Sequence, residues 1–157
     1  HELVAEAGLA DRISIDSAGT GSYHVGDDAD PRSRAAASRR GLEITHLARQ
    51  FTVADLDRFD LVIAMDAANA VALRRMLGNR STPTLHLLRS FDLTAPSSAD
   101  VPDPYYAGGD RGFEEVLDQC ERACDLLIRR GVIESECSAH ARENHLQSRK
   151  LCIDIKG

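Results

Sequence analysis

The sequence is poor in aromatic side chains. It has no tryptophan, and phenylalanine and tyrosine together make up only 4% of its 157 residues. Two of the three tyrosines, Tyr105 and Tyr106, are adjacent, so the scarce aromatic surface is concentrated in one stretch. Side chains with a flat apolar ring and a polar tip suit the wall of a binding cleft, although two tyrosines lying on a neighbouring helix would give the same pattern.

Long apolar runs and an excess of positive charge are also lacking. No apolar run approaches the roughly 18 residues that a membrane span needs, and nothing resembles a signal peptide. The net charge of −6 argues against a broad nucleic-acid footprint. With 43% hydrophobic and 28% charged residues, the chain has the composition of one soluble globular domain. We therefore expect a cytoplasmic protein that binds neither a membrane nor nucleic acid.

The four cysteines fit neither a dense disulfide framework nor the paired spacing of a zinc site, so we expect reduced thiols and no metal. Cys124 and Arg130 satisfy a Cys-x5-Arg pattern. They fall in a strongly periodic helical segment, however, where the backbone cannot wrap around a phosphate. Cys120 and Cys124 lie on the apolar stripe of that segment and are predicted to be core residues. Cys137 is followed by arginine after four residues, and Cys152 lies in a short apolar stretch.

Strand and helix patterns alternate along the chain. Apolar runs and alternation predict strands at residues 12–17, 61–65 and 84–88, and a further strand-like piece at Leu151 to Ile155. Helical spacing with capping residues predicts helices at residues 1–7, 31–40, 53–59, 69–77 and 113–130. This order predicts an α/β fold with a mainly parallel sheet and right-handed crossovers. Ligand sites in such folds lie at the carboxyl ends of the strands.

The stretch Val101-Pro102-Asp103-Pro104-Tyr105-Tyr106 is predicted to carry the chemistry. Each proline fixes its own φ and keeps the preceding residue extended, so Asp103 is presented on a stiff loop. A carboxyl shielded by aromatic walls has a raised pKa, which suits a general acid. An ordinary Asp-Pro turn is the alternative interpretation.

Four motifs in the same order resemble the low-molecular-weight protein tyrosine phosphatase family from about residue 1 to about residue 131. They are Asp16-Ser17-Ala18-Gly19-Thr20, His46-Leu47-Ala48-Arg49-Gln50, Ala64-Met65-Asp66 and Asp103-Pro104-Tyr105-Tyr106. The resemblance implies a flavodoxin-like three-layer fold with a four-stranded parallel sheet. It also implies hydrolysis of phosphotyrosine, in a protein or as a small aryl phosphate, through a cysteinyl-phosphate intermediate and without a cofactor.

By the same resemblance, Asp103 is the general acid and base. Tyr23, Tyr105 and Tyr106 flank the substrate ring. Ser17 hydrogen-bonds the phosphate-binding loop, and His46 with Asp66 forms a supporting pair on the scaffold. For His46 and Asp66, a purely structural hydrogen bond is the simpler alternative.

The family's Cys-x5-Arg loop, which follows a first and central strand, is missing from residues 1–157. We therefore expect a member of the family that is truncated at its amino end and inactive as given, with a polar tail of unknown role at residues 132–157. Leu151 to Ile155 could occupy the vacant strand position. Arsenate reduction on the same fold, using a further cysteine pair, and a non-catalytic binding role are the alternatives.

Overall fold

The computed structural model describes residues 1–105, 109–129 and, for the backbone, 149–154. Its strands form one parallel sheet in the order β1-β4-β2-β3. The bounds of the strands are β1 Ile13–Ala18, β2 Leu61–Ala64, β3 Thr84–Leu87 and β4 Arg149–Asp154. The predicted α/β class with a parallel sheet is thus confirmed. Residues 151–154 of the strand-like piece predicted at 151–155 join that sheet, and residue 155 lies outside the described residues.

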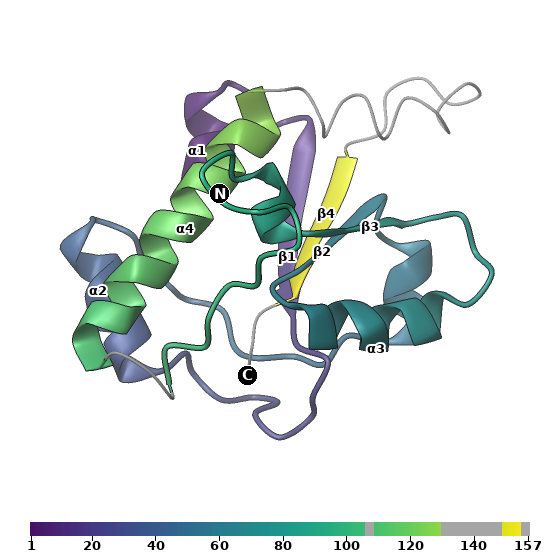
Figure 1. Cartoon of the computed structure of the whole chain (residues 1–157), viewed down its shortest axis with the longest axis horizontal. Coiled ribbons are helices and arrows are strands. Elements are labelled where there is room, and N and C mark those ends of the chain that lie inside the picture. The colour runs from purple at the N-terminus through teal and green to yellow at the C-terminus, as the bar shows by residue number, and fades with distance from the viewer. Residues whose placement is uncertain (106–108, 130–148, 155–157) are drawn as a thin grey trace.

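Helices cover both faces of the sheet, which makes three layers (Figure 1). Helices α1 (Glu2–Glu6), α2 (Pro31–Arg39) and α4 (Gly109–Arg129) lie on one side of it, and α3 (Ala67–Leu77) lies on the other. Two short 3-10 helices, η1 (Val53–Asp57) and η2 (Leu88–Phe91), complete the described elements.

Strand β2 contributes side chains to two hydrophobic cores, one on each face of the sheet, because its side chains alternate between the faces. Leu61 and Ile63 belong to a hydrophobic cluster with residues of α1, α4 and η2. Val62 and Ala64 belong to a second cluster with residues of η1 and α3. All four residues are buried, as expected of a strand covered on both faces.

Some predicted boundaries were wrong by a few residues. Helix α4 begins at Gly109 and not at residue 113, since the polar first turn adds nothing to the apolar stripe by which the helix was recognised. Helix α3 begins directly after Asp66, because the Asp66 side chain accepts a hydrogen bond from the Asn69 N–H at 2.7 Å and caps it. The chain leaves β3 at Leu87 and turns into η2, where the sequence predicted one more strand residue.

The predicted division of the chain at residue 131 stays a prediction. Strand β4, which comes from the segment predicted to be a tail, pairs in parallel with β1 over residues 149–154 and with β2 over residues 151–153. It is therefore an interior strand of the sheet.

None of the helices in the described parts of the chain is long and apolar enough to cross a membrane. Within the same parts, no group of three or more His, Cys, Asp or Glu side chains could hold a metal ion.

Candidate active site

Two predicted site residues lie where parallel strands end at the same edge of the sheet. Ser17 is the penultimate residue of β1, and its N–H donates to Asp16 Oδ1 at 2.8 Å. Asp66 follows β2 and caps α3. The first turn of α3 is tied to the loop after β1, because Asn69 Nδ2 donates to Thr20 Oγ1 at 3.2 Å. The carboxyl ends of β1 and β2 are thus joined by side chains as well as by the sheet.

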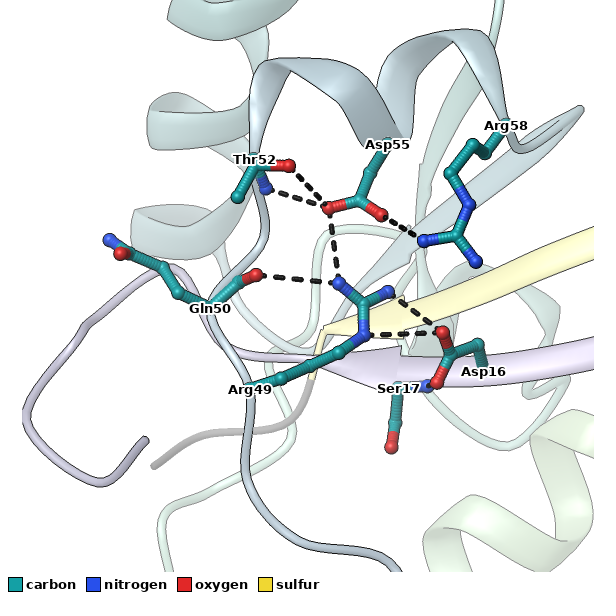
Figure 2. Close-up of polar contacts among 7 residues, drawn as sticks. All are labelled: Asp16, Ser17, Arg49, Gln50, Thr52, Asp55 and Arg58. Carbon is teal, nitrogen blue, oxygen red and sulfur yellow. Dashed lines mark hydrogen bonds and ion pairs between the residues drawn. The ribbon is translucent and has the colours of Figure 1, made fainter. Parts of the chain in front are cut away.

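Arg49 is the centre of a polar network at this edge that the sequence analysis missed (Figure 2). Its guanidinium donates from Nη2 and Nε to Asp16 Oδ2, at 2.9 and 3.2 Å. From Nη1 it donates to Asp55 Oδ2 at 3.1 Å and to the Gln50 carbonyl at 3.3 Å. One side chain therefore links β1 to η1, which lies far away in the sequence.

Asp55 is the most deeply buried carboxylate of this network, with 1% of the residue exposed. It stands at the third position of η1 and forms a capping box with Thr52, whose N–H and hydroxyl donate to Oδ2 at 2.8 and 3.0 Å. Arg58 Nη1 donates to the other oxygen at 3.2 Å. Burial would raise the pKa of Asp55, but the hydrogen bonds from Thr52 and Arg49 outweigh it and hold the pKa below its ordinary value.

The sequence did contain a signal for part of this network. Thr52-x-x-Asp55 has the spacing of a capping box and precedes an apolar segment. Nothing local to Arg49, however, indicates that its partners are Asp16 and Asp55.

The backbone beside Arg49 lines the loop that follows β1. The Gly19 N–H donates to the Arg49 carbonyl at 2.9 Å, and the Phe51 N–H donates to the Gly19 carbonyl at 2.8 Å. These bonds make a parallel bridge between Gly19 and Gln50. His46 lies exposed on the same segment. Asp66 Oδ1 accepts a hydrogen bond from the Asn69 N–H. The pairing of His46 with Asp66 stays a prediction.

The loop that presents Asp103 is anchored to the end of β2. Val101 is 1% exposed, and its N–H donates to the Met65 carbonyl at 2.9 Å. The Asp100 side chain accepts from the Ala67 N–H at 2.8 Å. Asp103 therefore extends from a fixed point only two residues away. It is half-buried, and its Oδ1 accepts a hydrogen bond from the Tyr105 N–H at 2.9 Å.

The tyrosines predicted to bind substrate have different surroundings. Tyr105 is 64% exposed, and the Arg32 guanidinium lies 5.2 Å from the centre of its ring and 4.7 Å from that of Phe113. Asp30 holds this guanidinium in place with hydrogen bonds at 2.8 and 3.1 Å. Tyr23, in the loop between β1 and α2, is 90% exposed. Tyr106 lies outside the described residues.

The predicted core role of two cysteines is confirmed. Cys120 and Cys124 lie on α4 and pack against the cluster that contains Leu61 and Ile63. Burial raises the pKa of Cys120 to about 12 and that of Cys124 to about 11. A thiol with so high a pKa is protonated at neutral pH and is a poor nucleophile. The Cys124 and Arg130 pattern thus has its cysteine in mid-helix, while Arg130 and Cys137 lie outside the described residues.

Comparison with known proteins identifies the family. The family model of the low molecular weight phosphotyrosine protein phosphatases matches residues 1–140. A low molecular weight protein-tyrosine-phosphatase of Streptomyces coelicolor is 47% identical over 127 residues, which are 80% of this chain and 77% of that protein. The relative YfkJ of Bacillus subtilis, which has the same designation, is 41% identical over 130 residues, which are 82% and 80% of the two chains.

A solved structure agrees with these relatives. The crystal structure of a protein tyrosine phosphatase from Entamoeba histolytica with Hepes in its active site superposes with a TM-score of 0.79. Its sequence is 33% identical, and the match covers 86% of this chain and 85% of that one. The chain belongs to the low molecular weight phosphotyrosine protein phosphatase family, a family of hydrolases, as the motif order predicted.

Proposed function

We propose that this chain carries the acid–base and substrate-binding residues of a site that hydrolyses phosphotyrosine in proteins or in small aryl phosphates. The observation that supports this most is the position of Asp103. Its loop is fixed to the end of β2 through Val101 and Met65, and the exposed ring of Tyr105 lies beside it in the chain. A half-buried carboxyl on such a loop can donate its proton to a departing phenolate oxygen, and can later accept a proton from the attacking water.

The remaining roles follow from the same proposal. Tyr23, Tyr105 and Tyr106 contact the aromatic ring of the substrate. Ser17, His46 and Asp66 are positioning residues for the loop that binds the phosphoryl group. The fixed geometry of the loop after β1, which Arg49 and the Gly19 bridge hold in place, favours a positioning role for Ser17.

We further infer that the polypeptide of residues 1–157, assayed alone, does not hydrolyse phosphate esters. The step that Asp103 assists needs a thiolate to attack phosphorus and main-chain amides to hold the phosphoryl oxygens. Cys120 and Cys124 are partly buried on the core side of α4 and have raised pKa values. On this proposal, β4 takes the central position that the resemblance assigns to the family's first strand, and no Cys-x5-Arg loop follows β4 within residues 1–157.

Arsenate reduction and a non-catalytic binding role, the two alternative functions, require different residues. Arsenate reduction needs a reactive cysteine pair, and the packing of Cys120 and Cys124 against the core, with their raised pKa values, does not favour them as that pair. A non-catalytic binding role needs no thiol, and would leave Asp103 without a chemical task.

Two proteins test the proposal. The first is the chain as given, assayed with p-nitrophenyl phosphate, with a phosphotyrosine peptide, and with arsenate plus thioredoxin. No turnover is expected in any assay. Hydrolysis of either ester would contradict the inferred inactivity, and arsenate reduction would establish the first alternative.

The second protein is a chimera in which the first strand and Cys-x5-Arg loop of the Streptomyces relative precede His1 and the chain ends before residue 149, so that β4 does not compete for the position of the restored strand. It is expected to hydrolyse both esters. In the chimera, Asp103→Asn should lower kcat by about 10²- to 10⁴-fold, the contribution typical of a general acid, with little change in phosphate binding. Asp110→Asn is the matched control, because Asp110 is an exposed carboxylate in the first turn of α4. A folded chimera without activity would refute the proposed function, and equal effects of the two substitutions would refute the role of Asp103.

A further inference from the structure

Strand β4 is an interior strand of the sheet although it is the last described element of the chain. Leu151, Cys152 and Ile153 each have a register partner in β1 on one side and in β2 on the other. Every backbone N–H of an interior strand is directed at one neighbour or the other. Without an occupant in this position, β1 and β2 would each present unpaired donors and acceptors inside the protein.

The two flanking strands are held in place by contacts that do not involve β4. At their carboxyl ends, the Gly19 and Gln50 bridge ties the loop after β1 to the segment that leads into η1. Ala18 of β1 and Val62 of β2 belong to one hydrophobic cluster with residues of η1 and α3. Ile13 of β1 and Leu61 of β2 belong to the other, together with residues of α4.

Contacts between helices α2 and α4, which cover one face of the sheet (Figure 1), also hold the two flanking strands in place. Arg40, at the end of α2, forms ion pairs with Glu114, Asp118 and Glu121 of α4 at 2.7, 2.8 and 3.1 Å. Helix α2 follows β1, and α4 packs on η2, which follows β3. The elements on either side of the β4 position are therefore linked through their helices by contacts among residues 1–105 and 109–129.

We propose that this position accepts β4 from a second copy of the chain, so that two copies exchange their β4 strands and form a reciprocal dimer. The donor strand has the same sequence and the same register whichever chain supplies it. Each hydrogen bond of the monomer is then also made in the dimer, and no new complementary surface is required.

The tether allows this exchange. Residues 130–148 join α4 to β4, and 19 extended residues can span up to about 60 Å. This reach exceeds the diameter of a domain of this size, which is about 35 Å from its compact radius. Because the swapped and unswapped forms make the same strand contacts, association entropy favours the monomer when the chain is dilute. The dimer is expected to increase with protein concentration and after refolding from a concentrated denatured solution.

A mixing experiment with the full chain tests the proposal. Unlabelled and ¹⁵N-labelled chains are denatured together, refolded at high concentration and analysed by native mass spectrometry. Dimers are expected, and about half of them should contain one chain of each kind. Cys152→Pro should abolish the dimer, because proline removes an N–H that an interior strand needs. Cys152→Ala, which keeps that N–H, should leave the dimer intact. A chain that stays monomeric at every concentration, or a Cys152→Pro dimer as abundant as that of the wild type, would overturn the proposal.

A peptide experiment covers the possibility that the proline variant does not fold alone. A synthetic peptide of residues 147–157 is added to the Cys152→Pro chain, and protection of the amides of β1 and β2 is followed by hydrogen exchange. The peptide should restore protection, whereas a scrambled peptide of the same composition should not. If neither peptide protects these strands, their shared position does not accept a strand in trans and the proposal is wrong.

Discussion

Replacement of Asp55 by asparagine is expected to destabilise the protein strongly, because this carboxylate accepts hydrogen bonds from two arginines and from Thr52 while almost completely buried. Asparagine has nearly the same size and can keep the bonds from Thr52 through its amide oxygen. In that position the amide oxygen also keeps the bond from Arg49, but without the negative charge, and the NH₂ group, a donor, is directed at the Arg58 donor. The substitution therefore removes charge and hydrogen bonding without leaving a cavity.

The magnitude follows from the loss of the negative charge. A hydrogen bond to a charged group contributes about 1.5–3 kcal/mol and a neutral one about 0.5–1.5 kcal/mol, so the bonds from Thr52 and Arg49 to Oδ2 together lose about 2–3 kcal/mol when the carboxylate becomes a neutral amide. The Arg58 side chain is 59% exposed, so that pair adds at most about 1 kcal/mol. We expect Asp55→Asn to lower the free energy of unfolding by about 2–4 kcal/mol, which is a large part of the 5–15 kcal/mol typical of a domain.

Urea unfolding followed by far-ultraviolet circular dichroism at pH 7 measures this loss. Asp57→Asn is the matched control, since Asp57 lies in the same 3-10 helix and pairs with Arg80 but has a side chain that is 68% exposed. The control should change the free energy of unfolding by no more than about 0.5 kcal/mol. Equal losses for the two variants, or a loss below about 1 kcal/mol for Asp55→Asn, would refute the reasoning.

The same comparison has a predicted pH dependence. The pKa of Asp55 is lower in the folded than in the unfolded protein, so its contribution is fully present above the unfolded value of about 3.9 and is lost as the pH falls through the folded value. The difference between wild type and Asp55→Asn should therefore be constant from pH 7 to about pH 5 and should shrink below about pH 4. A difference that stays unchanged down to pH 3 would show that charge is not its cause.

Two further predictions concern the cores. Leu73→Ala should lower the free energy of unfolding by about 2–5 kcal/mol, because Leu73 is 2% exposed in the cluster between α3 and the sheet. In the same urea titration, Val71→Ala on the same helix should change this free energy by less than about 0.5 kcal/mol, because Val71 is 47% exposed. Similar losses for the two variants would contradict the assigned packing. Cys120 and Cys124 should resist a thiol reagent at pH 8 in the native protein, because burial raises their pKa values to about 12 and about 11. Both should react once guanidinium unfolds the protein, and peptide mass spectrometry locates the modified cysteines. Rapid modification of either cysteine in the native protein would contradict the prediction.

Much of the candidate site could be predicted from the chain because its signals are local. The two prolines around Asp103 favour a stiff, extended loop by their own geometry. The end of the strand before Asp66 was predicted, but the helix that Asp66 caps begins at Ala67 and not at residue 69. The apolar stripe of α4 likewise identified Cys120 and Cys124 as core residues, as their burial confirms. Arg49 was missed as the centre of a network because its carboxylate partner Asp16 is 33 residues away along the chain.

The sequence by itself determined the order of strands and helices, the loop residues at the strand ends and the family, since periodicity, capping and motif order are properties of neighbouring residues. Only the tertiary structure decided which strands pair and which charges meet. Strand β4 lies between β1 and β2 because both need a partner for their backbone groups, and Asp55 stays ionised in the interior because Thr52 and Arg49 reach it there. Such contacts depend on the packing of distant segments, and no local pattern specifies them.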